Sequence, residues 1–403
     1  MTNLTPDLKL HRKPNLRVRI NSSNNVELRL DDRLHDLGPH GLAVLDAFYQ
    51  PTSISEAIQK LRSTVTSAQE WMALTNTIVN LYEAGVLQDN SGRTQQLETR
   101  TLSFGAPDLH VRMLNDQIRT CSFLAGISEV VNPGDVVVDI GTGSGVLAMA
   151  AARAGAKHVY AIEASAIGEC ARKIFEANEL ADRITLLKGW STQLEVPERA
   201  DVLVSEIIGN EPLGEDVLEI TADARKRLLE PTARLIPSKV RILGLPVTIP
   251  HGELTERFPT EENLRNWYSS YGMDFSPLAQ AAQSLPPAFF IKPYKARSWI
   301  TLSEPVLLAD VDLSKADSFI INNAVRAIAR TSGKLDGLLV YFELELGPTT
   351  RLTIDPARVD KTCNWRTLVW VLQPLTLEVG DLFEVSYRYR AGGATHELRV
   401  SRL

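Results

Sequence analysis

Hydrophobic and polar residues alternate in two short stretches near the start of the chain. Residues 16–20 (LRVRI) and 26–30 (VELRL) place an apolar side chain at every second position, which is the period of a β-strand with one buried face. The stretch between them, 21–25 (NSSNN), consists of residues that favour turns. The pattern predicts a β-hairpin.

Helical spacing of apolar residues follows the hairpin, and it predicts helices at 41–49, 53–62 and 68–84. Ser53 with Glu56 three residues later has the pattern of a capping box, and Gly85 is placed to end the last of these helices. A hairpin followed by helices predicts a small α+β domain over residues 1–90. The polar stretch 91–101 has no periodicity and predicts a linker.

The next region, 102–237, alternates short apolar runs with helical patterns. Strands are expected at 136–140, 158–162, 184–187 and 202–205, with helices at 146–154 and up to residue 178. Strands that alternate with helices are typical of a parallel sheet with crossover helices. We therefore expect a Rossmann-like α/β domain.

The last region, 238–403, has the texture of an all-β domain. Apolar and polar residues alternate at 340–346, 368–372 and 383–389, which predicts an antiparallel, β-barrel-like domain. A helix-like segment with aromatic residues interrupts the strands at about 255–295.

Composition and charge exclude several classes of protein. The chain has 403 residues and a net charge of −6, which argues against a general nucleic-acid partner. Its three cysteines, Cys121, Cys170 and Cys363, form no CxxC pair, so we expect no metal site and a reducing compartment. No signal-peptide pattern and no apolar run of about 18 residues is present. A cytoplasmic protein that spans no membrane is expected.

The strand at 136–140 runs into Gly141, Gly143 and Gly145 and then into a helix. Glycine lets the backbone turn tightly and approach a ligand closely. The spacing is GxGxG, whereas NAD-binding proteins favour GxGxxG, in which a helix N-terminus meets the pyrophosphate. S-adenosylmethionine (SAM) has no phosphate, so this spacing favours SAM over NAD.

Two acidic residues stand at the ends of the first two strands of this region. A carboxylate at Asp139 can meet the ammonium group of SAM, directly or through water. A carboxylate at Glu163 can accept hydrogen bonds from both ribose hydroxyls. We expect these two residues and Ala164, which follows Glu163, to line the cofactor site with the glycines.

Further motifs lie on both sides of this region. Residues 110–120 read HVRMLNDQIRT, Glu206 and Glu215 flank a loop after the fourth strand, and Asn364-Trp365 lies near the C-terminus. In this order, the motifs of residues 100–403 resemble those of the protein arginine N-methyltransferases. In that family an HxxMLxDxxRT helix closes over SAM, a loop with two glutamates holds a guanidinium, and a THW loop frames the pocket.

The resemblance implies a role for each matching residue. His110 and Arg119 would bind the SAM carboxylate, and Met113 would line the reacting centre. Glu206 and Glu215 would be the catalytic residues that grip the guanidinium. The other implied contacts are with the cofactor, from Asp139, Gly141, Gly143, Gly145, Glu163 and Ala164, and with the substrate, from Asn364 and Trp365.

Paired carboxylates suit the chemistry of a guanidinium group. This cation is planar and its lone pair is delocalised, so it is a poor nucleophile. Two carboxylates that bind it in bidentate fashion draw positive charge to one side and leave electron density on the attacking nitrogen. Positioning and electrostatics would supply most of the rate, without a strong base. Glu211, inside the same loop, is expected to be structural or solvent-facing.

The sequence departs from the family pattern at several places. Residues 100–104 (RTLSF) lack both tyrosines of the family's YFxxY segment, and the THW loop reads Cys363-Asn364-Trp365. The first glutamate is followed by Ile207-Ile208, and the adenine-side acid is missing near Ser191-Thr192. These changes leave SAM binding expected and bear on the number of methyl groups. Our hypothesis is a monomethylating or atypical enzyme.

The front domain, ending in LYEAGVL at 81–87, resembles the PqqD-type domains. Such domains recognise leader peptides of ribosomally made natural products by adding the leader to a small sheet as an extra strand. Residues 16–20 or 26–30 could offer that edge. A winged-helix-like fold or a structural cap fits the same pattern.

Three functions follow from these observations. The first is a SAM-dependent N-methyltransferase acting on arginine in a protein or in a peptide such as a natural-product precursor. The second is the same reaction on a small guanidino metabolite such as free arginine. The third is a catalytically weak SAM-binding scaffold, which the retained Glu206 and Glu215 argue against. Residues 271–276 (YGMDFS) match the family's dimerisation arm, so the resemblance also implies a head-to-tail homodimer.

Overall fold

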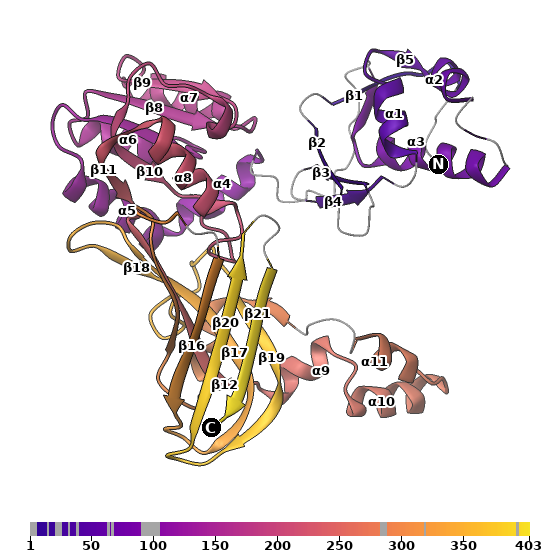
Figure 1. Cartoon of the computed structure of the whole chain (residues 1–403), viewed down its shortest axis with the longest axis vertical. Helices are drawn as coiled ribbons and strands as arrows, with labels where there is room; N and C mark the ends of the chain where they lie inside the picture. Colours follow the sequence, from indigo (N-terminus) through magenta and orange to yellow (C-terminus); the bar gives the residue numbers. More distant parts are fainter. Residues whose placement is uncertain are drawn as a thin grey trace. The chain divides into compact units, whose positions relative to one another are not determined.

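The computed structural model describes residues 6–13, 16–20, 26–30, 33–37, 40–62, 65, 68–89, 105–282, 288–317, 320–391 and 395–403. The chain divides into two compact units, Met1–Phe104 and Gly105–Leu403, which are coloured along the sequence in Figure 1. The expected linker at 91–101 and the stretch 100–104 that replaces the YFxxY segment lie outside the described residues.

The hairpin predicted in the first unit is present and carries an additional strand. Strands β2 (Arg17–Ile20), β3 (Val26–Leu30) and β4 (Arg33–Asp36) form an antiparallel sheet in the order β2-β3-β4. Val18 pairs with Leu28 in the register that alternation predicts. Because β3 pairs on both sides, our expectation that residues 26–30 could offer a free edge is wrong, whereas β2 does lie at an edge.

The helices of the first unit pack on a second small sheet. They are α1 (Gly41–Ala47), α2 (Ile54–Leu61) and α3 (Ala68–Glu83), and the sheet has the order β5 (Thr52–Ser53), β1 (Lys9–Arg12) and β6 (Leu87–Asp89). The capping box is confirmed, since the Ser53 side chain accepts from the backbone of Glu56 and the Glu56 side chain accepts from that of Ser53. Gly85 follows α3 with a φ of 70°, as a left-handed C-terminal glycine does. The shared core includes Leu10, Val44, Phe48, Leu74 and Leu87.

The second unit begins with helices α4 (Pro107–Asn115) and α5 (Gln117–Val130) and a parallel sheet. The sheet has the order β11 (Leu229–Ile236), β10 (Ala200–Ser205), β7 (Val136–Ile140), β8 (His158–Glu163) and β9 (Ile184–Lys188). Helices α6 (Val146–Arg153), α7 (Gly168–Ala177) and α8 (Val217–Arg227) connect the strands. This is the Rossmann-like arrangement that the sequence predicts. The strand order reverses between β7 and β10, which is where such sheets bind ligands.

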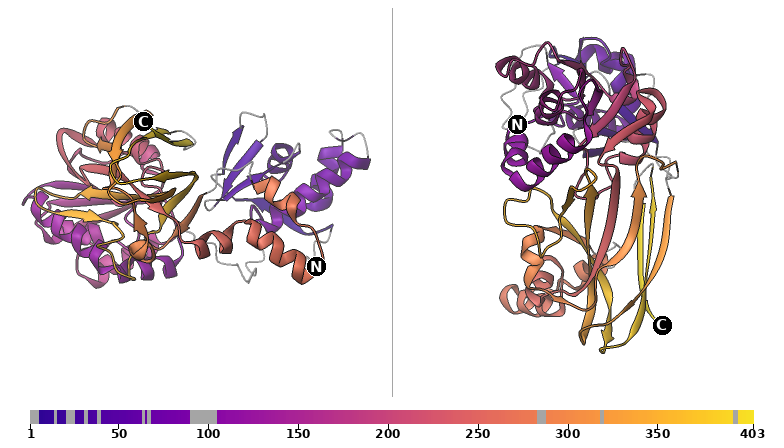
Figure 2. Two further views of the ribbon diagram at one scale, coloured as in Figure 1. Left: turned by 90° about the horizontal axis from the view of Figure 1, so that it is seen from below. Right: turned by 90° about the vertical axis from the view of Figure 1, so that its left-hand side faces the viewer.

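The rest of this unit is built from antiparallel strands, as predicted. One sheet has the order β13 (Ala288–Ile291), β19 (Thr367–Leu377), β17 (Gly333–Glu345), β12 (Lys239–Thr248) and β14 (Ile300–Thr301), with β15 (Val306–Asp312) on β12 and β18 (Arg351–Thr353) on β17. A second sheet has the order β16 (Ile320–Ile328), β20 (Leu382–Arg390) and β21 (Thr395–Arg402). Figure 2 shows these long strands running away from the parallel-sheet domain.

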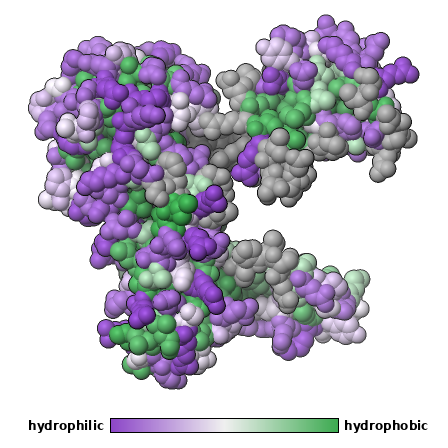
Figure 3. Space-filling model, in the orientation of Figure 1, coloured by the Kyte–Doolittle hydropathy of each residue, from purple (hydrophilic) through white to green (hydrophobic). Residues whose placement is uncertain are grey.

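One continuous apolar core joins the parallel sheet to the antiparallel strands. It contains side chains from both, including Val138, Leu203, Ile242, Leu308 and Phe342. A large apolar side chain that is fully buried stabilises a fold by roughly 1.5–3 kcal/mol. The two parts therefore pack as one body. Figure 3 shows hydrophilic residues over much of the visible surface of the parallel-sheet domain, as expected when its apolar side chains face inward.

The segment at about 255–295 contains strand β13, which pairs with β19, so our expectation of a helix-like segment is wrong for that part. Helices form the part before it, as the pattern predicts. They are α9 (His251–Arg257), α10 (Glu261–Tyr271) and α11 (Ser276–Ala282). Trp267 and Phe275 meet edge-on at 5.7 Å between ring centroids, whereas Tyr268, Tyr271 and Met273 are exposed. In the described part of the chain, no helix has both the length and the apolar character to cross a membrane.

Candidate active site

The loop between β7 and α6 contains Gly141, Gly143 and Gly145, with φ angles of 76°, 57° and 85°. All three also face close neighbours, and a Cβ atom added at Gly145 would overlap Phe175 Cε1. A Cβ atom added at Gly141 would lie 2.7 Å from Ile207 Cγ2, and one added at Gly143 would lie 2.8 Å from His110 Cε1. The loop therefore needs glycine for both its conformation and its space.

Asp139 lies in β7 directly before this loop and is fully buried. The Thr142 hydroxyl donates to its Oδ2 atom at 2.6 Å, while its Oδ1 atom is buried with no hydrogen-bond partner among the described residues. Burial is the main cause that raises the pKa of Asp139 to about 7, and the charge of Glu163 adds to it. A buried carboxylate oxygen without a partner is an acceptor for a cationic ligand group.

Glu163 ends β8, and its carboxylate joins two loops. Its Oε2 atom accepts from the backbone N–H of Gly143 at 2.9 Å, and its Oε1 atom accepts from that of Ser165 at 2.7 Å. Ala164 lies between Glu163 and Ser165 in the chain, and its side chain is exposed. The parallel register of β7 and β8 brings Asp139 opposite Ala161, so both acids stand at the same end of the sheet.

Helices α4 and α5 bring the residues of the HVRMLNDQIRT motif to the glycine loop. His110 is buried against Gly143, and Asp116 caps α5 by accepting from the backbone N–H of Arg119 at 3.1 Å. The Arg119 guanidinium donates to the backbone oxygen of Met113 at 3.3 Å. Burial lowers the pKa of Arg119 to about 10, opposed by the charge of Asp116, so this side chain remains a cation at neutral pH.

Glu206 follows β10 and stands next to the glycine loop. The parallel pairing of β10 with β7 sets Ser205 opposite Ile140, so the residues that follow them emerge side by side at the switch in strand order. Glu206 forms an ion pair with Arg119, and both side chains are more than nine-tenths buried. One ion pair thus connects Arg119, a candidate cofactor residue, to Glu206, a candidate substrate residue.

Glu215, at the other end of the loop after β10, packs back onto the loop. Its Oε1 atom would lie 2.5 Å from a Cβ atom added at Gly209. Only a glycine at this position lets the Glu215 side chain approach the backbone so closely. The Glu215 side chain therefore packs against the backbone of its own loop at Gly209.

Asn364 and Trp365 reach the site from the loop before β19. The Asn364 backbone N–H donates to Asp116 Oδ2 at 2.7 Å, and the Trp365 Nε1–H donates to the Ile208 oxygen at 2.7 Å. The Arg119 guanidinium carbon lies 5.4 Å from the centroid of the Trp365 ring, within cation–π range. This loop therefore joins the antiparallel domain to both the cofactor side and the substrate side of the site.

Several residues at the site carry no role in the sequence analysis. Asp116 stands inside the recognised motif, and its place before a helical pattern is the local signal of an N-cap. Lys292 donates from Nζ to the oxygens of Cys363 and Asn364, at 2.6 and 2.9 Å. It lies 72 positions from Asn364, so no local pattern could have identified it. Burial lowers the pKa of Lys292.

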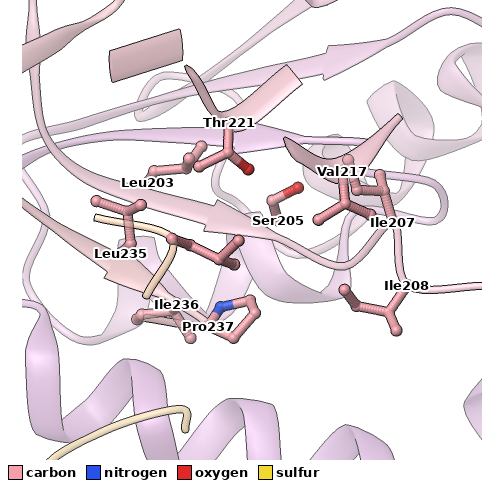
Figure 4. A pocket seen from close by; sticks show the side chains of 10 residues that line it. Leu203, Ser205, Ile207, Ile208, Val217, Thr221, Leu235, Ile236 and Pro237 are labelled. Carbon is pink, nitrogen blue, oxygen red and sulfur yellow. The ribbon is translucent and has the colours of Figure 1, made fainter. Parts of the chain in front are cut away.

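A small apolar pocket lies behind the loop that carries Glu206 (Figure 4). Its lining comes from β10, the loop, α8, the end of β11 and the residue after β15: Leu203, Ser205, Ile207, Ile208, Val217, Thr221, Leu235, Ile236, Pro237 and Leu313. None of the candidate site residues lines it, and it offers no charged group. It is therefore a packing gap beneath the site. Among the described residues, no group of three or more His, Cys, Asp or Glu side chains could hold a metal ion.

Comparisons with known proteins identify relatives of this chain. Residues 119–240 match the family described as ribosomal protein L11 methyltransferase (PrmA). A solved structure described as the Trypanosoma brucei PRMT1 enzyme-prozyme heterotetrameric complex with AdoHcy has a TM-score of 0.61 and 24% identity, over 75% of this chain and 99% of that one. This likeness concerns the fold.

Two curated relatives carry the comparison further. The probable histone-arginine methyltransferase 1.3 of Arabidopsis thaliana is 32% identical over 67% of this chain, but this chain spans only 51% of that protein. The arginine N(omega)-methyltransferase of Streptomyces achromogenes subsp. streptozoticus is 31% identical over 73% of this chain and 78% of its own length. On this similarity, the chain belongs to the protein arginine N-methyltransferase family.

Proposed function

We propose that this protein is a SAM-dependent N-methyltransferase that acts on the guanidino group of arginine. The proposal rests on one observation. The glycine loop after β7 and Glu206 after β10 emerge side by side where the strand order of the sheet reverses. There Arg119, a candidate cofactor ligand, pairs with Glu206, a candidate substrate ligand. The family membership supports the same reaction class.

The residues around the loop fit SAM on chemical grounds. The unpaired Oδ1 atom of Asp139 suits an ammonium, the cationic Arg119 suits a carboxylate, and the carboxylate of Glu163 suits two ribose hydroxyls. His110 packs over Gly143 and would close one side of the bound amino-acid portion. When bound, SAM supplies an electrophilic methyl group on its sulfonium.

The protein's own part in the reaction is to bind and orient the guanidinium. Glu206 and Glu215 would accept its N–H groups, which concentrates positive charge near the carboxylates and leaves one nitrogen more electron-rich. Trp365 holds the loop backbone at Ile208, and Met113 and Asn364 would complete the wall around the reacting nitrogen. Because both glutamates lie on one short loop, their positions depend on how firmly that loop is held.

We further propose arginine in a peptide or protein as the substrate, with the first unit supplying affinity away from the chemistry. Strand β2 lies at the edge of its sheet and could receive a leader peptide as an added strand. Free arginine is the second candidate, favoured by the Streptomyces relative, whose description names arginine itself.

Methyl-labelled SAM distinguishes the two substrates. The purified protein is incubated with a size-fractionated extract of its source cells, and the label is followed by mass spectrometry. Label on arginine in peptides is expected, and deletion of residues 1–90 should then raise the peptide KM and spare SAM binding. Label confined to small guanidino compounds would reverse the order of the candidates. SAM binding with no label would favour a SAM-binding scaffold.

A head-to-tail homodimer is also proposed for the protein, through the arm of helices α9–α11. The exposed Tyr268, Tyr271, Met273 and Leu278 on this arm support it, because clustered exposed apolar side chains mark association surfaces. Sedimentation of the wild type and of a Tyr268→Asp/Tyr271→Asp variant tests the proposal. A wild type that sediments as a monomer at micromolar concentration would refute it.

A further inference from the structure

The loop between the two candidate glutamates is held by the antiparallel domain along its whole length. Besides the contact of Trp365 with Ile208, the Arg366 backbone N–H donates to Asn210 Oδ1 at 2.7 Å, and the Tyr389 hydroxyl donates to the Leu213 oxygen at 2.8 Å. Between these anchors stands Glu211, whose side chain is expected from the sequence to be structural or solvent-facing.

Glu211 meets a histidine from the last strand of the chain. Its Oε2 atom lies 3.2 Å from Nε2 of His396 on β21. The His396 side chain is only 11% exposed, whereas that of Glu211 is 34% exposed. Among the described contacts that hold this loop to the antiparallel domain, the contact of Glu211 with His396 joins two ionisable side chains. The other contacts join backbone groups or neutral side chains.

Two tyrosines fix the histidine ring. The antiparallel register sets His396 opposite Tyr389, and their rings lie 5.0 Å apart. The Tyr387 oxygen lies 3.2 Å from His396 Nδ1. Burial raises the pKa of both tyrosines, so their hydroxyls stay protonated. When the Tyr387 hydroxyl donates to Nδ1, the imidazole hydrogen is on Nε2, the ring atom that lies 3.2 Å from Glu211 Oε2. Nε2 itself forms no hydrogen bond among the described residues, so the contact with Glu211 is one of proximity and charge.

Glu211 is linked to Glu215 through the turn between them. The Gly214 N–H donates to the Glu211 backbone oxygen at 2.9 Å, and Leu213 in the same turn is held by the Tyr389 hydroxyl. A displacement of Glu211 therefore moves the turn that directly precedes Glu215.

We propose that Glu211 and His396 are positioning residues, which hold the second half of the loop so that Glu215 stays in place for the guanidino substrate. We call the contact between Glu211 and His396 the tether. The inference rests on the proposed function for its substrate, but the tether can be measured without turnover. Glu211 acts through the loop backbone and does not touch the substrate.

Hydrogen–deuterium exchange of residues 209–218 tests the tether in the full-length protein without substrate. Exchange is expected to be faster in Glu211→Ala and His396→Ala than in the wild type, and nearly normal in Glu211→Gln, whose side chain keeps its length and its reach to His396. Glu397→Gln is the matched control, because Glu397 is the next residue on β21 and pairs with Arg388 on the exposed side. Unchanged exchange in both alanine variants would overturn the tether.

Kinetics with free arginine and a short arginine peptide test the positioning role. Both alanine variants should raise the KM of the guanidino substrate by about tenfold, with SAM affinity unchanged and with Glu211→Gln largely restored. Faster exchange with an unchanged KM would overturn the positioning role. A wild type that methylates neither substrate would contradict the proposed function, and the exchange result would still decide the tether.

Discussion

Arg119 and Glu206 form a buried ion pair that joins the two halves of the candidate site. Arg119 comes from the helix expected to close over the cofactor, and Glu206 comes from the loop expected to hold the guanidinium. The carboxylate of a bound cofactor would take Arg119 away from Glu206. The guanidinium of a bound substrate would likewise take Glu206 away from Arg119. The two binding events should therefore be coupled.

Replacing Arg119 by methionine should weaken SAM binding by about 10- to 100-fold, because charge-assisted hydrogen bonds to a carboxylate are lost. The change also leaves the Glu206 carboxylate buried without its cation, which should destabilise the fold by roughly 3–5 kcal/mol. Calorimetric titration with SAM and thermal unfolding measure the two effects. Arg112→Met is the control, since Arg112 is partly exposed and, among the residues that the structure describes, its ion pair is with Asp108 at 3.5 Å. Equal SAM affinity in both variants would exclude Arg119 from the cofactor site.

Asp139 should make SAM binding depend on pH. Burial raises the pKa of Asp139 from its usual 3.8 to about 7, so between these values the folded protein binds a proton that the unfolded chain does not. The stability from this group is therefore highest below pH 3.8 and falls as the pH rises to about 7. An ammonium ligand favours the ionised carboxylate, so SAM affinity should increase as the pH passes through 7. Titrations from about pH 5.5 to 8.5 should show this slope in the wild type and lose it in Asp139→Asn. The same slope in both proteins would rule out Asp139 as its source.

Alanine at Gly143 should damage the cofactor site more than alanine at another left-handed glycine. Gly134 has a φ of 94° and open space around its Cβ position, whereas Gly143 has a φ of 57° and faces the His110 ring. Both substitutions carry a backbone cost of about 1–2 kcal/mol, but only Gly143→Ala displaces His110. SAM affinity should fall by at least about tenfold in Gly143→Ala and stay near the wild-type value in Gly134→Ala. Equal SAM affinities, at comparable melting temperatures, would argue against a closely packed loop.

A single methyl group per guanidine is expected in the product. Asn364 replaces the histidine of the family's THW loop, and its contact with Asp116 comes from its backbone N–H and not from a charged side chain. Mass spectrometry of the arginine product after long incubation measures the methyl count. Two methyl groups on one guanidine would disprove the monomethyl hypothesis.

The sequence predicts the elements whose patterns are local and misses those whose partners are distant. The alternation at 136–140 and the glycines after it specify β7 and its loop, and the structure has both where predicted. The additional strands β1 and β5 are too short to show a period, and they pair across a span of more than 40 residues. Lys292 and His396 likewise take their meaning from partners that only the folded chain brings near.

The contacts among the site residues follow from the fold and not from the sequence pattern. Nothing in the spacing of Glu206 and Glu215 alone predicts that Gly209 backs the second glutamate or that Arg119 pairs with the first. Those relationships arise from the parallel pairing of β10 with β7 and from the packing of α5 on α6 and β11. The loop's anchors on Trp365 and Tyr389 depend on a domain that begins after residue 238.

The most direct test of the account is the turnover of Glu206→Gln with methyl-labelled SAM and an arginine substrate. The amide keeps the shape of the side chain and removes its charge, so it can no longer hold a guanidinium as a carboxylate does. Turnover should fall by about 10²- to 10³-fold while SAM binding persists, and the exposed-site control Glu198→Gln, which removes only a surface pair with Lys157, should stay fully active. Full activity in Glu206→Gln would contradict the proposal that the two glutamates bind and orient the guanidino group.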